Sequence, residues 1–294
     1  MRAVFYVFSG TGNTRRVSEK LMEEWCALGH EAVLADIRVN GEYPDPADFD
    51  VVVVGYPVHG FNAPTSVLKF LKSLPKRKGE KRPAYLLRSS GEPLRLNDAS
   101  GITPRRILKK RGFETLGEFH FVMPYNIIFR HSDGMAARMW QDAELLAGEY
   151  ARTMSGLKRK KTGVNVFKRM AAFVVRIEHT AMPVIGHHFK ATKSCVGCGA
   201  CAKLCPQGNI TMADGKPKFA RKCVGCMACA FGCPKDAIST GVLNGWRVNG
   251  AYTFEGAPAT DKEVCRYCRK AYLRYFHNAE KILEGHNESP ADQR

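Results

Sequence analysis

Two cysteine runs with the same spacing constrain this chain more than any other feature. The first run is Cys195, Cys198, Cys201 and Cys205, followed by Pro206. The second run is Cys223, Cys226, Cys229 and Cys233, followed by Pro234. The second run repeats the first at an offset of 28 residues. Such dense runs indicate thiolates that share a bound group rather than cysteines spread through a disulfide framework.

The rest of the composition favours metal-bound cysteines in a reducing compartment. The chain has 294 residues, 45% of them apolar, so it can build a core without disulfide staples. It has 11 cysteines, an odd number, and the short apolar run 2–8 is not typical of a secretory signal peptide. We therefore expect a cytoplasmic location, where thiols stay reduced.

Zinc sites and iron–sulfur clusters are the two alternatives for the cysteine runs. Zinc ribbons use two pairs of cysteines, whereas here three cysteines at two-residue gaps precede a fourth and a proline. Over residues 188–242 the pattern resembles bacterial ferredoxins with two [4Fe–4S] clusters. The resemblance implies that the fourth cysteine of each run binds the other cluster. One cluster would be held by Cys195, Cys198, Cys201 and Cys233, and the second by Cys223, Cys226, Cys229 and Cys205.

The first 157 residues alternate between apolar, strand-like segments and helical segments. Strands are expected at 2–8, 31–37, 50–55, 83–88 and 117–123. Helices are expected at 13–28, 63–74, 102–111 and 134–157. This alternation predicts an α/β fold, a doubly wound five-stranded parallel sheet. Ligands of such sheets bind at the carboxyl ends of the strands.

Three loops at those strand ends carry a candidate binding site. After the first strand the sequence reads Ser9, Gly10, Thr11, Gly12, Asn13 and Thr14, and a helix follows at once. This loop resembles the phosphate loop of flavodoxins, in which backbone amides and hydroxyls surround the phosphate of FMN. The third-strand loop contributes Tyr56, Pro57, Val58, Gly60 and Phe61, and the fourth contributes Ser89, Ser90 and Gly91. The resemblance implies that these loops contact the flavin and that Tyr56 or Phe61 stacks on it.

Together the halves resemble a fusion family, the EFR-type ferredoxins, in which a flavodoxin-like domain precedes a small α+β bacterial ferredoxin domain. The expected domains are 1–157, a basic connector at 158–187, the ferredoxin domain at 188–242, and a C-terminal extension with a terminal helix at 243–294. The resemblance implies an electron-transfer protein that uses FMN and two [4Fe–4S] clusters. An FMN-dependent reductase of a small molecule is the alternative, with His59, Tyr125, Glu92 and Arg130 as candidate proton donors. A third hypothesis is a regulatory protein in which the clusters have a structural role.

The charge of the chain indicates the general kind of partner that it binds. The formal net charge is +17, and residues 158–190 hold eight Lys or Arg against one Asp or Glu. This excess favours an acidic redox partner protein, and no motif for nucleic-acid recognition accompanies it. A basic amphipathic helix is expected at 164–182, with Phe167, Met170, Val174 and Ile177 on one face. It serves as a solvated connector, docks an acidic partner or lies on an anionic membrane; no segment is long and apolar enough to span a bilayer.

The remaining polar and sulfur side chains give weaker signals. Cys265 and Cys268 are expected in a terminal helix over 262–283, either as a redox or metal pair or as two ordinary thiols. Cys26 is expected in the core. His59 is interpreted as a neutral surface residue or as a partner of the flavin. No ligand spacing connects His179, His187 and His188, which are expected at the surface.

Overall fold

The computed structural model describes residues 1–77, 79–160 and 163–287. Its N-terminal part is a parallel sheet of five strands. They are β1 (Arg2–Val7), β2 (Glu31–Asp36), β3 (Val51–Pro57), β4 (Arg82–Ser90) and β5 (Phe113–Val122). Their order in the sheet is β2-β1-β3-β4-β5, which is the flavodoxin-like order of doubly wound folds. The structure thus confirms the predicted fold class.

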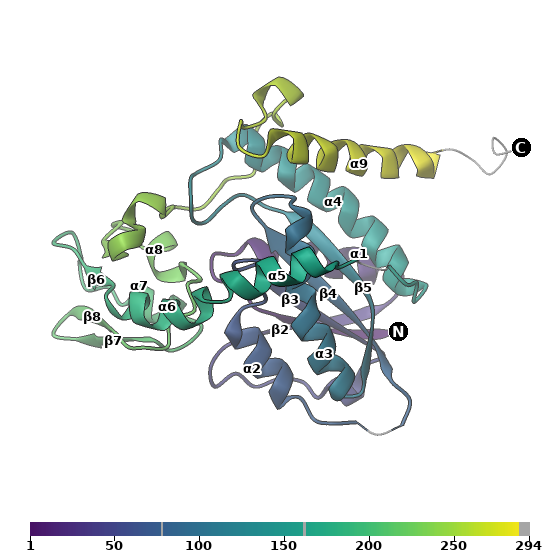
Figure 1. Cartoon of the computed structure of the whole chain (residues 1–294), viewed down its shortest axis with the longest axis horizontal. Coiled ribbons are helices and arrows are strands. Elements are labelled where there is room, and N and C mark those ends of the chain that lie inside the picture. The colour runs from purple at the N-terminus through teal and green to yellow at the C-terminus, as the bar shows by residue number, and fades with distance from the viewer. Residues whose placement is uncertain (78, 161–162, 288–294) are drawn as a thin grey trace, which may run out of the picture.

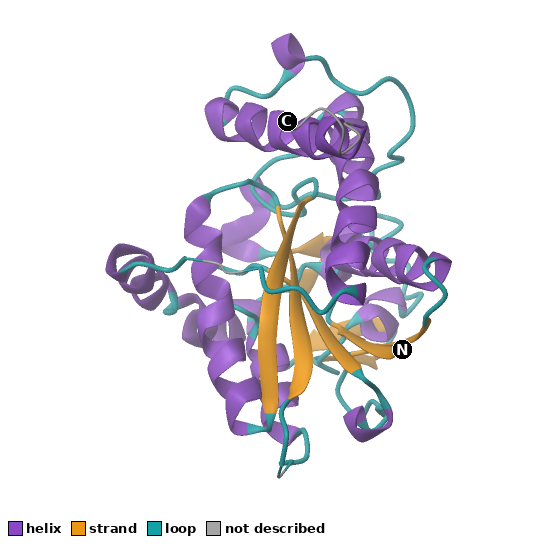
Figure 2. Cartoon of the chain, turned by 90° about the vertical axis from the view of Figure 1, so that its right-hand side faces the viewer, coloured by secondary structure: helices purple, strands orange, loops and turns teal. Residues whose placement is uncertain are grey.

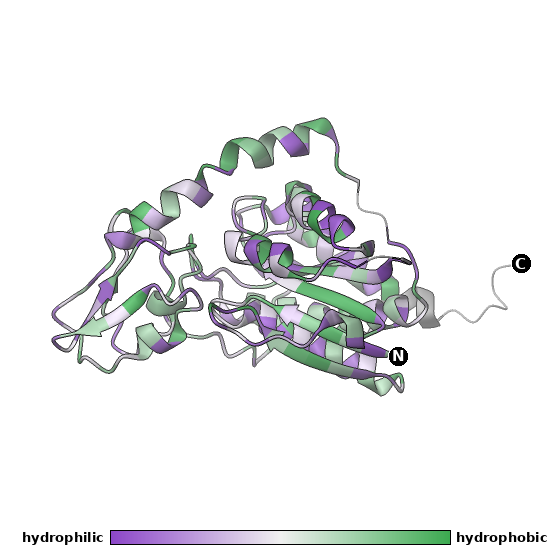
Figure 3. Ribbon diagram, turned by 90° about the horizontal axis from the view of Figure 1, so that it is seen from below, coloured by the Kyte–Doolittle hydropathy of each residue, from purple (hydrophilic) through white to green (hydrophobic). Residues whose placement is uncertain are grey.

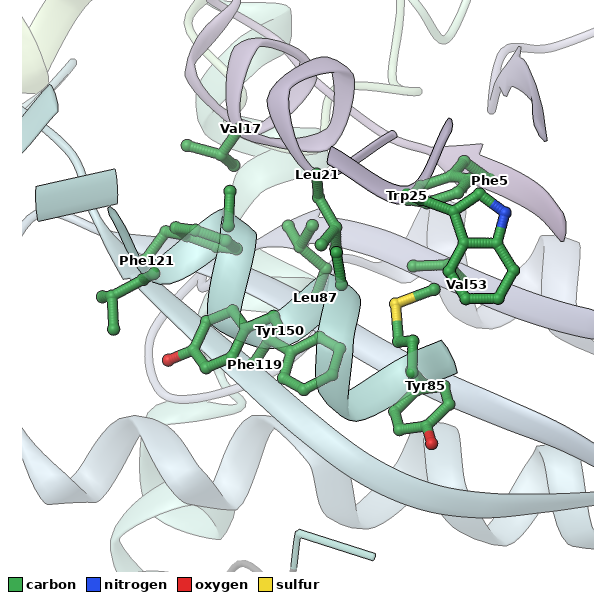
Figure 4. Close-up of a cluster of buried hydrophobic side chains, with 14 of the residues drawn as sticks. Phe5, Val17, Leu21, Trp25, Val53, Tyr85, Leu87, Phe119, Phe121 and Tyr150 are labelled. Atoms are coloured by element: carbon green, nitrogen blue, oxygen red, sulfur yellow. The ribbon is translucent and has the colours of Figure 1, made fainter. Parts of the chain in front are cut away.

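Helices cover both faces of this sheet (Figures 1 and 2). On one face lie α1 (Asn13–Ala27) and α4 (Asp133–Ser155), and on the other lie α2 (Thr65–Ser73) and α3 (Ile102–Lys110). The face under α1 and α4 holds a row of aromatic rings, in which Phe119 stacks between Tyr85 and Tyr150 at centroid distances of 5.2 and 4.3 Å (Figure 4). Alternate strand residues face the two layers, so the sheet is buried on both sides.

The C-terminal segment packs back on the sheet half. Helix α9 (Arg269–Asn287) lies along α4, where Tyr272 and Phe276 are buried against methionines of α4. The expected helix over 262–283 is therefore wrong at its start. A 3-10 turn at Asp261–Glu263 comes first, and Cys268 adopts a positive φ of 52° directly before α9. Cys265 and Cys268 consequently lie in the turn before the helix.

The connector contains two helices rather than the single one expected over 164–182. They are α5 (Val166–Val175) and α6 (Glu178–His187). Between them the backbone adopts the narrower hydrogen bonding of a 3-10 helix. The Arg176 N–H donates to the Phe173 carbonyl at 3.2 Å, and the Ile177 N–H donates to the Val174 carbonyl at 3.5 Å. α5 contacts the 3-10 segment at Arg95–Gly101, and α6 leads into the cysteine-rich region. No helix of the described residues is long and apolar enough to cross a membrane.

The cysteine-rich region is small and built from short elements. Strand β6 (Lys190–Ala191) pairs antiparallel with β9 (Ile238–Ser239), and β7 (Ile210–Ala213) forms a hairpin with β8 (Lys216–Phe219). Its helices are α7 (Ala200–Leu204) and α8 (Ala228–Phe231). The following segment, residues 241–258, forms a 3-10 helix at Gly241–Trp246 and then irregular structure.

Candidate functional site

A cavity of about 580 Å³ lies at the carboxyl ends of β1, β3 and β4. Its lining comes from segments far apart in the sequence. The sheet half contributes the loops after these strands and residues 123–128. α6 and the cysteine-rich region contribute the opposite wall, including Met182, Ile185 and Cys226. The cavity is therefore enclosed between the two halves of the molecule.

The loop after β1 offers an anion-binding helix terminus. Gly12 precedes α1 with φ = 101°, a left-handed conformation that glycine adopts without strain. The N-cap residue Gly12 has no side chain that could cap the helix, and no acidic residue occupies its first turn. Ser9 Oγ instead accepts from the amides of Gly12 and Arg15 at 3.2 and 3.3 Å. Amides gathered at the start of a 15-residue helix fit a phosphate group.

Buried hydrogen bonds connect the loops around this helix terminus. Thr14 and Ser89 share a hydroxyl–hydroxyl bond of 2.8 Å. Asn13 Nδ2 donates to the carbonyl of Pro124 at 2.8 Å, and Asn126 donates to Thr11 Oγ1. These bonds fix the phosphate-type loop against the loops after β4 and β5, so the cavity floor is preorganised.

Most residues expected around a flavin do line the cavity. They are Ser9, Gly10, Thr11, Asn13, Thr14, Pro57, Val58, Gly60, Phe61, Ser89, Ser90 and Gly91. Gly12 faces a neighbouring groove beside Arg15 and Arg16. Tyr56 does not reach the cavity, because its side chain points to the opposite face of β3 and is fully buried in the core under α2 and α3. The structure therefore does not fit the expectation that Tyr56 stacks on a flavin.

The loop after β5 supplies a polar wall. Tyr125 packs so tightly over Gly91 that a Cβ on that glycine would overlap the Tyr125 ring. The Tyr125 hydroxyl donates to the carboxylate of Glu92, and burial raises the pKa of Glu92 above its ordinary value. Arg130, another expected proton donor, points elsewhere and donates to backbone carbonyls at residues 249–251.

Helix α6 forms a wall that the sequence did not indicate. Met182 and Ile185 contribute apolar surface to the cavity, and the Glu178 carboxylate lies against Gly60. Burial raises the pKa of Glu178, since no cation is paired with it among the described ion pairs. The apolar face expected at 164–182 consists of Phe167, Met170, Val174 and Ile177, which all precede α6, so the sequence did not reveal which neighbour α6 covers.

His59 also lines the cavity. Burial, together with the nearby His179, lowers the pKa of His59 to about 4. The ring is therefore neutral at pH 7, as the sequence interpretation held, but it is half-buried in the cavity wall rather than on the open surface.

The eight cysteines of the two runs gather around two separate hollows. One hollow is lined by Cys195, Cys198, Cys201 and Cys233. The other is lined by Cys205, Cys223, Cys226 and Cys229. Each hollow thus takes three cysteines from one run and the fourth from the other, the grouping that the ferredoxin resemblance implies.

The two runs also repeat their backbone conformation. Gly197 and Gly199 have φ of 71° and 73°, and the equivalent residues 28 positions later, Gly225 and Met227, have 72° and 56°. Asn209 N–H donates to Cys205 Sγ at 3.3 Å. Its counterpart Ala237 N–H donates to the sulfur of Cys233 at 3.2 Å. Amides directed at sulfur stabilise thiolates and tune the metal group that they bind.

The environment of the thiols fits a cationic metal core. Burial raises the pKa of Cys226 to about 12 and that of Cys229 further. The neighbouring cysteines add to both shifts, so clustered thiolates need a positive group between them. Among the described residues, no three His, Cys, Asp or Glu side chains converge as closely as one metal ion requires.

The second hollow adjoins the cavity at the strand ends. Cys226 lines both of them. A Cβ built on Gly10 of the phosphate-type loop would lie 2.8 Å from Cys226 Cβ. Val224 and Cys226 also pack against the apolar core of the sheet half. The structure therefore brings one cysteine group into direct contact with the loop at the cavity floor.

The other cysteines and histidines form no comparable site. Cys265 and Cys268 are half-buried beside Tyr272, and Cys265 donates to the Tyr267 carbonyl at 3.4 Å. Cys26 is exposed, so the expectation of a core thiol is wrong. It sits on the outer side of α1, whereas Trp25 takes the buried position. His187 and His188 are exposed, as expected, whereas His179 is half-buried near His59, so the expectation that it lies at the surface is wrong.

Comparison with known proteins supports the two halves separately. Residues 194–238 match the family described as 4Fe-4S dicluster domain. A search of curated proteins finds no match. This chain therefore contains a 4Fe-4S dicluster domain behind a flavodoxin-like fold.

Solved structures resemble the N-terminal part. A flavodoxin from Streptococcus pneumonia TIGR4 is 15% identical, with a TM-score of 0.40 over 53% of this chain and 99% of that one. General stress protein 14 from Treponema denticola, solved in complex with FMN, is 15% identical, with a TM-score of 0.40 over 54% and 100%. Rubredoxin oxygen:oxidoreductase from Desulfovibrio gigas is 16% identical, with a TM-score of 0.36 over 53% and 36%. Because these identities and TM-scores are low, the flavodoxin-like fold is assigned from the order of the strands in the sheet.

Proposed function

We propose that this protein transfers electrons between FMN, two [4Fe–4S] clusters and a redox partner protein. The observation that carries the proposal is the contact between Gly10 and Cys226, because it joins the predicted phosphate loop to a predicted cluster loop. FMN, when bound, can accept two electrons and release them singly, and each cluster carries one at a time. Holding these groups on one chain removes a diffusional encounter.

The cluster and flavin ligands follow from the two hollows and the cavity. Cys195, Cys198, Cys201 and Cys233 would hold the outer cluster, and Cys205, Cys223, Cys226 and Cys229 the one beside the cavity. The α1 terminus and Ser9, Thr11 and Thr14 would hold the phosphate of FMN. Pro57, Val58, Gly60, Phe61, Ser90 and Gly91 would surround its ring. The domains proposed from sequence, 1–157, 158–187, 188–242 and 243–294, fit this assignment, although the last packs on the first.

Membership of the EFR-type fusion family is part of the same proposal. So are a cytoplasmic location and an acidic redox partner. The basic excess of residues 191–240, seven Lys or Arg against two Asp or Glu, supports that charge of partner. Lys235 is exposed and lines the hollow of Cys195, Cys198, Cys201 and Cys233, and the exposed Lys216 and Lys218 flank Pro217 of the same lining, so such a partner would approach there.

One observation favours the second function, a reductase of a small molecule. The cavity keeps a buried carboxyl, Glu92, in a hydrogen bond with Tyr125, and burial raises the pKa of that carboxyl. A carboxyl with a raised pKa beside a flavin is a suitable proton donor. Reoxidation of the reduced protein by a small acceptor, lost in Glu92→Gln, supports this function; reoxidation by protein partners alone excludes it.

Composition analysis tests the proposed cofactors. The protein is purified anaerobically, and iron, sulfide and extractable flavin are counted per chain. The proposal predicts about eight irons, about eight sulfides and about one FMN, as two cubanes and one flavin require. Zinc in place of iron contradicts the cluster assignment. A full complement of iron without FMN after reconstitution contradicts the flavin assignment.

A further inference from the structure

Helix α5 exposes its apolar side to the outside of the molecule. Five of its apolar side chains are between 63% and 70% exposed: Val166, Phe167, Met170, Phe173 and Val174. At about 100° per residue they fall within an arc of about 120°. Figure 3 shows this helix along an edge of the molecule, away from the sheet. A continuous apolar face of this kind marks an interaction surface.

The inner side of α5 is already used by the fold. Lys168 Nζ pairs with Asp98 at 2.7 Å, Ala172 is buried, and Val175 lines the cavity. Asn165 caps the helix by accepting from Lys168 N–H at 3.0 Å. The helix is therefore held in place by its small and polar residues. Its large apolar residues make up the outward arc.

The positive charge around the apolar face of α5 indicates which kind of partner binds it. Arg169 and Arg176 are exposed and lie on the same border of the apolar arc. Neither has a carboxylate partner among the described ion pairs. The surrounding segment 158–190 holds eight Lys or Arg against one Asp or Glu. A second copy of the chain would bring the same positive charge to the contact, which disfavours self-association through α5.

We propose that α5 docks this protein on an anionic phospholipid surface. The apolar arc enters the boundary between headgroups and acyl chains, and Arg169 and Arg176 reach lipid phosphates. The helix lies in the plane of the membrane and does not cross it. The docking stands on the surface of α5 alone and does not depend on which cofactors the protein carries.

Vesicle flotation tests the docking. Purified full-length protein is mixed with vesicles of phosphatidylcholine alone or with about 30% phosphatidylglycerol, and the floating fraction is measured against lipid concentration. We expect binding to the anionic vesicles that is at least tenfold stronger than to the neutral ones and that weakens with salt. Absence of flotation with both vesicles, or equal flotation with both, overturns the proposal.

Two variants show whether α5 is the contact. Phe167→Ser/Met170→Ser/Phe173→Ser removes three exposed side chains, so the fold is expected to persist, and flotation falls at least tenfold. The control Leu28→Ser/Val39→Ser/Val242→Ser removes three exposed apolar side chains elsewhere and leaves flotation unchanged. Arg169→Gln/Arg176→Gln weakens binding about tenfold. If the α5 variant floats like the parent, or if it abolishes a dimer seen by sedimentation without affecting flotation, the proposal is wrong.

Discussion

The two halves of this protein are held together by different means. The sheet half buries two large apolar clusters, with Trp25, Phe119 and Leu86 fully inside. The cysteine-rich half has a much smaller core, in which Cys201 and Cys229 are themselves members. Apolar burial is enough to fold the first, whereas the second depends on the group that its cysteines bind. In the cysteine-rich half, the residues that would bind the cofactor also stabilise the fold. In the sheet half, almost all of the core residues that stabilise the fold are different from the residues that line the cavity.

The contact between the halves joins these two kinds of structure. Val224 and Cys226 pack on the apolar core of the sheet half, while Gly10 leaves room for Cys226. The cysteine loop thus gains a rigid support. The sheet half, which has a large core of its own, therefore fixes the position of the cysteine loop, which has little core of its own.

The largest expected effect is that of metal removal. Stripping iron anaerobically with a chelator is expected to lower amide hydrogen-exchange protection in 188–242 on the order of 100-fold, because the thiols of the two cysteine runs then lose the groups that join them. Protection in β1, β3 and β4 is expected to remain. Equal loss in both halves, or loss in neither, would contradict the comparison. Cys26→Ser, an exposed thiol outside both groups, serves as the control.

A core cavity in the sheet is expected to have the next largest effect. Leu86 is fully buried beneath α2 and α3. Leu86→Ala should lower the free energy of unfolding of the sheet half by about 2–5 kcal/mol. Chemical denaturation monitored by circular dichroism measures it. Leu28→Ala, on an exposed leucine, should change it by less than about 0.5 kcal/mol. Iron content should stay unchanged in both.

A smaller effect is expected where the halves touch. The Cβ of Gly10→Ala would collide with Cys226 and push the cysteine loop from the phosphate-type loop, at about 1–3 kcal/mol. We expect weaker flavin retention and altered cluster signals in electron paramagnetic resonance. Gly245→Ala, which has open space around its Cβ, is the matched control. Unchanged flavin affinity in Gly10→Ala would show that this contact is unimportant.

The smallest expected effect is a pH dependence confined to the sheet half. Burial raises the pKa of Asp142 to about 7 from an ordinary value of 3.8. A carboxyl with a raised folded-state pKa binds its proton more tightly when folded, so its penalty is absent below about pH 4 and grows as pH rises to about 7. The free energy of unfolding of the sheet half should therefore fall as pH rises across that window. Asp142→Asn should flatten the profile; an unchanged slope would locate the titrating group elsewhere.

Local patterns predicted the parts of the fold that depend on neighbouring residues. The valine run at 51–54 and the glycine-rich loop at 9–14 correctly placed a buried strand and a helix start. The strand and the helix start follow from short-range geometry, which the sequence states directly. The grouping of four cysteines around each hollow is what the resemblance to bacterial ferredoxins implied.

The errors arose where long-range packing decides. Tyr56 adjoins the flavin-type loop in sequence, but the alternation of side chains along β3 directs it into the core. Glu178, Met182 and Ile185 line the cavity although 56 or more residues separate them from Val122 at the end of β5. Cys265 and Cys268 fall before α9 because the chain turns at a left-handed Cys268. Apart from the alternation along β3, these placements have no local signature.

Electron transfer within single molecules tests the central claim most directly. The oxidised holoprotein receives less than one electron per chain from a pulse, and flavin and cluster absorbance are followed in time at several protein concentrations. Exchange between the two signals at a rate independent of concentration is the predicted result. A rate proportional to concentration, or no exchange at all, would contradict the claim that the contact between Gly10 and Cys226 joins two redox centres.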